Sequence, residues 1–162
     1  MNETTKDPRP NPSLQKKSAA RTAAVQCLYT QALQQKMLTP AKQVERLKEQ
    51  LDGNKGEQTL QVGIPLEPNY TLLTTLLEGV AQHVLDIDQR ISRVLSKGWT
   101  PERMGPLLIA ILQCAVFELF FGKDVKHKII IDEYTRLTRS FCGDDEVDFV
   151  YGALSKLVDQ LK

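Results

Sequence analysis

Apolar residues recur along the chain at the spacing of an α-helix, and this pattern predicts a protein built of helices. The clearest stripe lies within residues 73–94 and consists of Leu73, Leu76, Leu77, Val80, Val84, Ile87, Ile91 and Val94. Residues three and four apart lie on one face of a helix, so each stripe offers a surface for a core. Strand-like segments do not alternate with these helices. The sequence therefore predicts an all-α fold, a compact bundle of about seven helices.

The first predicted helix begins at a capping serine, Ser13 or Ser18, and runs to about Met37. Its apolar face is expected to comprise Val25, Leu28, Tyr29, Ala32 and Leu33. Further along the chain, Thr39 and Thr100 each precede a proline, which suits the first turn of a helix. The Gly105-Pro106 pair is expected to interrupt the helix that follows Thr100.

The domain boundaries follow from composition. Residues 1–15 are rich in Pro, Asn and Thr and carry no apolar signal-peptide core, so they are expected to form a disordered lead-in, and no export is implied. Residues 16–162 are expected to form a single domain. Within that domain, residues 52–69 hold three glycines and two prolines and predict a long connection. One short strand at residues 59–64 is the alternative there.

The most apolar run, "LLIAILQCAVFELFF", covers residues 107–121. It is shorter than the roughly 20 residues that span a membrane, and Gln113 and Glu118 interrupt it. A buried helix is therefore expected, and no membrane contact. Because this helix is apolar nearly all round, it is expected either at the centre of the bundle or partly in an interface, such as that of a homodimer.

Charge and cysteine content limit the functions that the sequence can support. The 21 basic and 20 acidic residues nearly cancel, so nucleic-acid binding would have to use a local patch. The three cysteines form no CxxC pair, and Cys27 and Cys114 lie in apolar helical patterns that predict buried thiols. This usage suits a reducing cytoplasm, and neither a metal nor another cofactor is expected.

The residues offer little for catalysis. Asp132 and Glu133 are adjacent on a predicted helix and point about 100° apart, so they do not converge as an acid/base pair. His83 and His127 have no nucleophile partner signature, and the phosphate-loop, zinc and nucleophile motifs are absent. A binding module is therefore favoured over an enzyme.

Three blocks of sequence resemble the NusB family of transcription antitermination factors. They are "ARTAAVQCLY" (20–29), "LLEGV" (76–80) with "WTPERM" (99–104), and a third block that joins "AILQCAVFEL" (110–119) to "DVKHKIIIDEYTRLTRSF" (124–141) and "DDEVDFVYGALSKL" (144–157). The third block is the most specific, because its parts keep the family's order and nearly its spacing. The resemblance covers about residues 17–158.

The resemblance implies an all-helical RNA-binding protein without enzymatic activity. Such a protein pairs with the small-subunit ribosomal protein NusE and holds the boxA element of nascent ribosomal RNA. The pair then helps the RNA polymerase antitermination complex to read through terminators during rRNA transcription.

The resemblance also supplies candidate RNA-binding residues, namely Lys16, Lys17, Arg21, Asp145 and Phe149. Lys and Arg near a helix start can neutralise phosphates, and an aromatic ring beside a turn can stack on an unpaired base. Asp145 is expected to cap the last helix whether or not it also contacts RNA.

Tyr29 and Glu102 are the candidate partner-binding residues, although a tyrosine at the rim of the core is an equal alternative for Tyr29. The chain departs from the family pattern at Asp148, where a basic residue is frequent, and at Ile109 and Gln113, where arginines are common. Each lost cation lowers the counterion-release contribution to RNA affinity. Binding of RNA is therefore expected to depend strongly on NusE.

Two alternatives remain open at this point. One is the RNA-recognition domain that precedes an rRNA cytosine methyltransferase, which would require a following domain with a Gly-rich cofactor loop. The chain carries no such domain, so a stand-alone factor is expected. The other is a protein-binding helical adaptor with a weakened RNA face.

Overall fold

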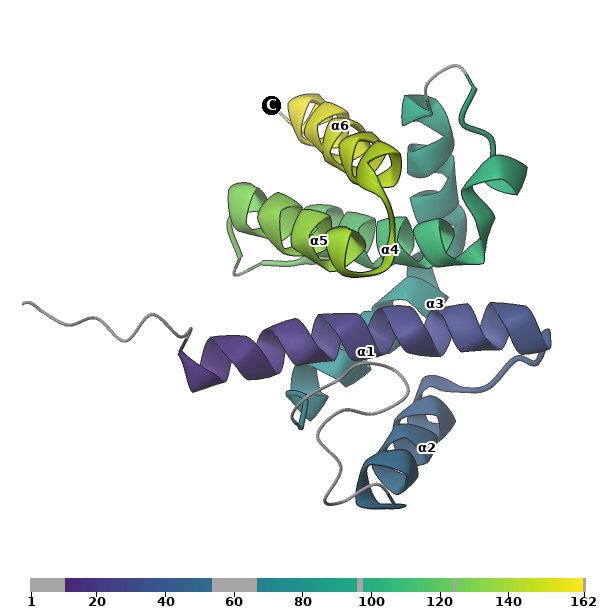
Figure 1. Cartoon of the computed structure of the whole chain (residues 1–162), viewed down its shortest axis with the longest axis vertical. Helices are drawn as coiled ribbons and strands as arrows, with labels where there is room; N and C mark the ends of the chain where they lie inside the picture. The colour runs from purple at the N-terminus through teal and green to yellow at the C-terminus, as the bar shows by residue number, and fades with distance from the viewer. Residues whose placement is uncertain (1–10, 54–66, 96–97, 124, 162) are drawn as a thin grey trace, which may run out of the picture.

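The computed structural model describes residues 11–53, 67–95, 98–123 and 125–161, and within them it contains six α-helices and no strand (Figure 1). The helices are α1 (Pro12–Gln34), α2 (Pro40–Gly53), α3 (Tyr70–Val94), α4 (Pro101–Phe121), α5 (His127–Phe141) and α6 (Asp144–Gln160). The predicted all-α class is confirmed. The alternative strand at 59–64 lies outside the described residues.

The first helix begins earlier than the sequence suggested. Asn11 is its N-cap, because the Asn11 side chain accepts a hydrogen bond of 2.7 Å from the backbone N–H of Ser13. Proline at the next position, Pro12, suits the first turn of a helix and makes Asn11 the natural cap. The predicted caps Ser13 and Ser18 are therefore wrong, and residues 12–15, assigned to the lead-in, are helical.

The starts of α2 and α4 and the break within α4 agree with the predictions from the sequence. The hydroxyl of Thr39 accepts a hydrogen bond from the Lys42 N–H, and that of Thr100 accepts one from the Arg103 N–H, each at 3.2 Å. Gly105 has φ 74° and ψ 170° inside α4. This left-handed conformation is easy only for glycine, so it separates the first turn of α4 from the long apolar part that follows.

The start of α6 corrects another expected cap. Gly143 is the N-cap, and its backbone N–H donates a 3.1 Å hydrogen bond to the side chain of Glu146. Asp145 lies at the second helical position, so it does not cap the helix. The three acidic side chains of this first turn, Asp144, Asp145 and Glu146, still favour the positive end of the helix dipole.

The apolar helix α4 occupies the centre of the bundle and packs against α1, α3, α5 and α6. Its buried residues are Met104, Leu108, Ala110, Ile111, Leu112, Cys114, Ala115, Val116, Phe117, Glu118 and Leu119. By length and composition α4 is the one helix among the described residues that could cross a membrane, but most of its apolar surface is buried against its neighbours. The expectation of a central core helix is confirmed.

In Figure 1, α5 and α6 lie on one side of α1 and α2 lies on the other. The buried face of α1 is made largely of small residues, Ala19, Ala20, Ala23 and Ala24, which let neighbouring helices approach closely. Where α3 meets α4, a side chain at Gly79 would overlap the ring of Phe117. These close approaches fix α1 and α3 against α4, and α1 thereby holds its first turns at a defined place on the surface.

Candidate nucleic-acid interface

Two lysines stand at the start of α1. Lys16 is exposed and Lys17 is half-buried. The backbone carbonyl of Lys16 accepts a 3.0 Å hydrogen bond from the N–H of Asn69, which ties this part of α1 to the start of α3. The two lysines therefore stand on a part of α1 whose position is set by the fold.

Arg21, the third predicted RNA-binding cation, is inside the protein. Only 5% of its surface is exposed. Its guanidinium makes a bidentate ion pair with Glu118, with Nε 2.7 Å from Oε2 and Nη2 3.0 Å from Oε1. A third nitrogen, Nη1, donates to Glu133 at 3.2 Å. Such paired, charge-assisted hydrogen bonds hold the guanidinium in one orientation.

The two carboxylates have further partners. The Tyr134 hydroxyl donates to Glu118 at 2.5 Å, and the Ser18 hydroxyl donates to Glu133 at 2.7 Å. Arg136 pairs with the other oxygen of Glu133 at the surface. Asp132, the neighbour of Glu133, is exposed. Asp132 therefore faces solvent, whereas Glu133 pairs with Arg21 inside the protein. The two carboxylates do not converge, as expected for a helix that only packs.

Burial and neighbouring charges shift the pKa of two members of this cluster, Arg21 and Tyr134. Burial by itself lowers the pKa of Arg21, but the hydrogen bonds and charge of Glu118 outweigh it and hold the pKa above its ordinary value. Burial and then the Glu118 charge raise the pKa of Tyr134 well above its ordinary value. Arg21 therefore stays charged and Tyr134 stays neutral at physiological pH, so the guanidinium is committed to the carboxylates.

The expectation that Arg21 faces RNA is corrected by this geometry. A guanidinium that pairs with the buried carboxylate of Glu118 and the half-buried carboxylate of Glu133 has no surface to offer to a phosphate. The physical reason is that Glu118, on the central helix, is itself buried and requires a cation beside it. Arg21 connects α1 to α4 and α5, and it orients the helix that carries Lys16 and Lys17.

The ring of Phe149 is also less accessible than predicted. Its exposed fraction is 8%, and it stacks against Trp99 with ring centroids 4.3 Å apart and an angle of 22° between the planes. The guanidinium carbon of Arg103 lies 4.8 Å from the Trp99 ring. The expectation that Phe149 itself stacks on a base is corrected, because α6 packs Phe149 inward and Trp99 lies against it.

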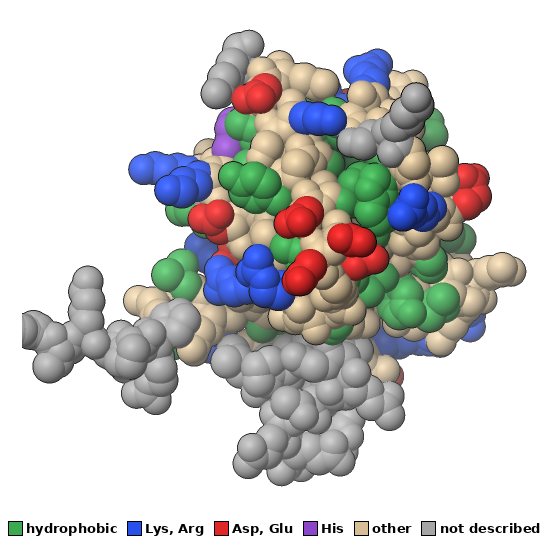
Figure 2. Space-filling model, turned by 45° about the horizontal axis from the view of Figure 1, so that its top comes forward, with side chains coloured by type: hydrophobic (Ala, Val, Ile, Leu, Met, Phe, Trp, Pro, Cys, Tyr) green, Lys and Arg blue, Asp and Glu red, His purple; other side chains and the backbone are tan. Residues whose placement is uncertain are grey.

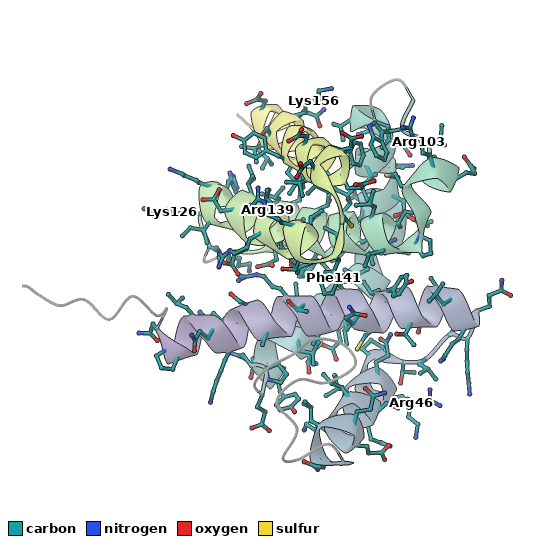
Figure 3. All side chains as sticks on the ribbon, viewed as in Figure 1. Arg46, Arg103, Lys126, Arg139, Phe141 and Lys156 are labelled. Carbon is teal, nitrogen blue, oxygen red and sulfur yellow. The ribbon has the colours of Figure 1, made fainter. Side chains whose placement is uncertain are left out.

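A groove between the start of α4 and α6 adjoins this aromatic pair. Its volume is about 350 Å³, and the charged side chains that line it are Arg103, Asp145, Asp148 and Lys156. Figure 3 shows Arg103 on α4 and Lys156 on α6 in the same upper part of the molecule. In Figure 2 several acidic side chains gather near the middle of the face turned toward the viewer, with basic side chains around them.

The two candidate partner-binding residues lie on α1 and α4. Tyr29 is half-buried and Glu102 is exposed. Glu102 lines a groove of about 720 Å³, whose walls also contain Leu28, Ala32 and Met37. Ala32 is exposed, as is Leu33 at 57%. Beyond Val25, the predicted apolar face of α1 is thus only partly covered by this chain, which is typical of a protein-binding surface.

The cysteines do not contribute chemistry. All three are free thiols, and burial raises the pKa of Cys27 to about 11 and also raises that of Cys114. Such thiols remain protonated at neutral pH and react slowly. Among the residues that the structure describes, no group of three or more His, Cys, Asp and Glu side chains could hold a metal ion.

Sequence reasoning passed over Trp99, Arg103 and Lys156. Trp99 and Arg103 are four residues apart in "WTPERM", a spacing that could have suggested a contact. Phe149 is too distant along the chain for its contact with Trp99 to be foreseen. For Arg21, the internal Glu118 of an apolar run was the available signal, since a buried carboxylate needs a partner.

Comparisons with known proteins agree with this architecture. A sequence model of the NusB family matches residues 18–159. The transcription antitermination protein NusB of Caulobacter vibrioides is 29% identical over 144 residues, which are 89% of this chain and 93% of that protein.

Two solved structures have the same fold. The structure of T. maritima NusB superposes with a TM-score of 0.70 at 19% identity and covers 94% of each chain. A crystal structure of the antitermination factors NusB and NusE with dsRNA gives a TM-score of 0.67 at 22% identity, covering 88% of this chain and 96% of the other.

Proposed function

The chain belongs to the NusB family, and from this premise we propose that it binds the boxA element of nascent rRNA together with NusE and supports processive rRNA transcription. Its relatives are transcription antitermination proteins, which are not enzymes. The family match over residues 18–159 is the observation that carries the proposal. A related protein has been crystallised with NusE and dsRNA, which supports the same two partners here. The function places the protein in the cytoplasm, with the RNA polymerase antitermination complex.

In this proposal RNA and protein partner use different surfaces. Lys16, which is exposed, and Lys17, which is half-buried, are assigned to the phosphates of the RNA. Glu102 with the 720 Å³ groove that it lines, and Tyr29, which is not part of that groove, are assigned to NusE. Both surfaces include part of helix α1. Binding of NusE at the later turns of α1 can therefore support binding of RNA at its first turns.

The test is fluorescence anisotropy of a labelled boxA RNA against the protein, with and without NusE, at two salt concentrations. We expect affinity that rises with NusE and falls with salt, because phosphate contacts release counterions. A protein-binding adaptor is the second candidate, favoured by the burial of Arg21 and by the three acidic residues in the first turn of α6. Capture of NusE without RNA binding in any condition would favour the adaptor.

Replacing Lys16 and Lys17 together by alanine is expected to weaken boxA binding. Each phosphate contact on a single strand contributes roughly 0.7 to the slope of log affinity against log salt, so losing both should reduce the slope by roughly 1.4. The melting temperature should hardly change, because Lys16 is exposed and Lys17 half-buried.

The matched control for this variant is the pair Lys42→Ala with Lys48→Ala on α2. Both lysines are exposed, and they interact within the chain with Glu45 and with the Tyr70 ring, respectively. Binding and salt slope should stay at the wild-type values. An equal loss in both variants would mean that net charge, and not the start of α1, governs RNA binding.

Glu102→Lys is expected to weaken capture of NusE by about 5-fold, a loss of about 1 kcal/mol. The carboxylate is exposed at the rim of the partner groove, and a reversed charge there changes its complementarity to a partner. Isothermal titration calorimetry with NusE measures the effect. Glu49→Lys, an exposed position on α2, is the control, and an equal effect there would remove Glu102 from the interface.

A further inference from the structure

The connection between α1 and α2 lines part of the groove that is assigned to NusE (Figure 1). Gln35 ends α1 in a left-handed conformation, with φ 51° and ψ 36°. The backbone N–H of Lys36 then donates a 3.3 Å hydrogen bond to the carbonyl of Gln31, and the N–H of Leu38 donates a 2.8 Å hydrogen bond to the side-chain oxygen of Gln31. The backbone on both sides of Met37 is therefore held by α1.

The side chain of Met37 is presented to a partner and not to the core. It lines the groove, yet 86% of it is exposed, the largest exposed fraction of any large apolar side chain among the described residues. Methionine suits a protein-binding surface, because its unbranched and polarizable side chain adapts to the shape of a partner. Met37 is thus a side chain that NusE can bury when it occupies the groove.

The same exposure leaves the thioether of Met37 accessible to peroxides. Of the three methionines in the chain, Met104 is only 7% exposed, and Met1 lies outside the described residues. Oxidation converts an apolar thioether into a polar sulfoxide. In this two-electron step one oxygen atom of hydrogen peroxide bonds to the sulfur, the O–O bond breaks, and the other oxygen leaves as water.

The cysteines are poorer targets for peroxide at neutral pH. Burial raises the pKa of Cys27 to about 11, and it also raises the pKa of Cys114 and that of Cys142. Peroxides react with the thiolate, which is scarce when the pKa is high. Among the described residues, Met37 is therefore the sulfur-containing side chain that dilute peroxide should modify first.

We propose that Met37 is an oxidation site through which peroxide weakens the pairing of this chain with NusE. The thioether packs against NusE in the groove, whereas the sulfoxide buries a polar group there without a hydrogen-bond partner. Reduction by a methionine sulfoxide reductase, with a thiol as the electron donor, restores the apolar surface. The inference rests on the proposed function, because that function assigns the groove to NusE.

The test begins with the full chain treated with dilute hydrogen peroxide. Catalase then removes the peroxide, and dithiothreitol reduces any oxidised thiol. Mass spectrometry of the peptides that contain Met37 and Met104 measures oxidation, and isothermal titration calorimetry with untreated NusE measures affinity. We expect Met37 to gain one oxygen atom, Met104 to stay unmodified, and the affinity for NusE to fall roughly 5- to 150-fold. Sulfoxide reductases that act on both epimers should restore it.

Two variants locate the effect at the groove. Met37→Leu carries no thioether at this position, so its own affinity for NusE should be the same before and after peroxide. The double variant Met37→Leu with Ile129→Met moves the thioether to a position on α5 that is 48% exposed and does not line the groove. Peroxide should oxidise this methionine without changing the affinity for NusE. Circular dichroism melts verify that each variant folds.

The possible failures of the inference and of the proposed function are distinct. Full affinity for NusE after oxidation of Met37, or an equal loss of affinity in peroxide-treated Met37→Leu, would overturn the inference and leave the proposed function intact. Absence of oxidation at Met37 would do the same. If the untreated protein does not bind NusE, the inference and the proposed pairing with NusE are both overturned.

Discussion

Replacing Arg21 by alanine is expected to lower the free energy of unfolding by about 3–5 kcal/mol, because it leaves the buried carboxylate of Glu118 without its cation. Glu118 is 5% exposed and retains only the Tyr134 hydroxyl among its described partners. For a domain of this length such a loss corresponds to a fall in melting temperature of roughly 6–20 °C. Urea unfolding followed by far-UV circular dichroism measures it.

Arg136→Ala is the matched control for Arg21→Ala. Arg136 also pairs with a glutamate, Glu133, but its side chain is 60% exposed, so its loss should cost less than about 1 kcal/mol. The double variant Arg21→Met with Glu118→Leu removes this ion pair and should recover part of the stability, since the buried Tyr134 hydroxyl is left without its Glu118 acceptor. Equal effects of Arg21→Ala and Arg136→Ala would show that the internal ion pair does not stabilise the fold.

The expected loss of stability in Arg21→Ala also affects RNA binding by that variant. A variant that unfolds at the assay temperature loses RNA binding whatever its side chain touches. Lys16 and Lys17 act at the surface, so their variants separate binding from stability where Arg21→Ala does not. Retention of RNA affinity by the folded double variant would establish that the Arg21 guanidinium does not contact RNA.

Leu112→Ala is expected to destabilise the protein by about 2–5 kcal/mol. The Leu112 side chain is fully buried in the middle of α4, and its truncation leaves a cavity that the surrounding helices fill only in part. The denaturant midpoint should fall while the slope of the unfolding transition stays unchanged. This variant tests directly whether α4 is the central helix in solution.

Ile109→Ala on the same helix provides the comparison. Ile109 is half-buried and lines the groove assigned to NusE, so its truncation removes less buried surface and should cost less. It should instead weaken NusE capture. A small effect of Leu112→Ala together with a large effect of Ile109→Ala would contradict the placement of α4 and reverse its buried and open faces.

Much of the fold was predictable because its signals are local. The stripe from Leu73 to Val94 and the Thr100 cap each depend on a few neighbouring residues. The break at Gly105 is also local, because the glycine permits a positive φ and the proline that follows it disfavours a continuous helix. The predicted caps failed at Asn11 and Gly143, where several polar residues competed within one turn and the sequence did not decide among them.

The candidate site was predicted less well, because a side chain's role depends on what lies beside it. Lys16 and Lys17 project from the first turns of α1 as expected. Arg21 lies one turn further on, where the helix faces α4. The sequence alone does not distinguish a basic residue on the exposed face of α1 from one on the face that packs against α4.

The sequence by itself determined the helical class, the apolar central helix and the absence of recognisable catalytic motifs, since periodicity and composition are properties of the chain alone. Only the tertiary structure decided that Arg21 pairs with Glu118, which is 97 residues away, and that Trp99 covers Phe149 beside a groove. Those contacts arise where helices cross, and a crossing is fixed by packing over the whole bundle. The side chains available to a partner are therefore those that the core leaves outside.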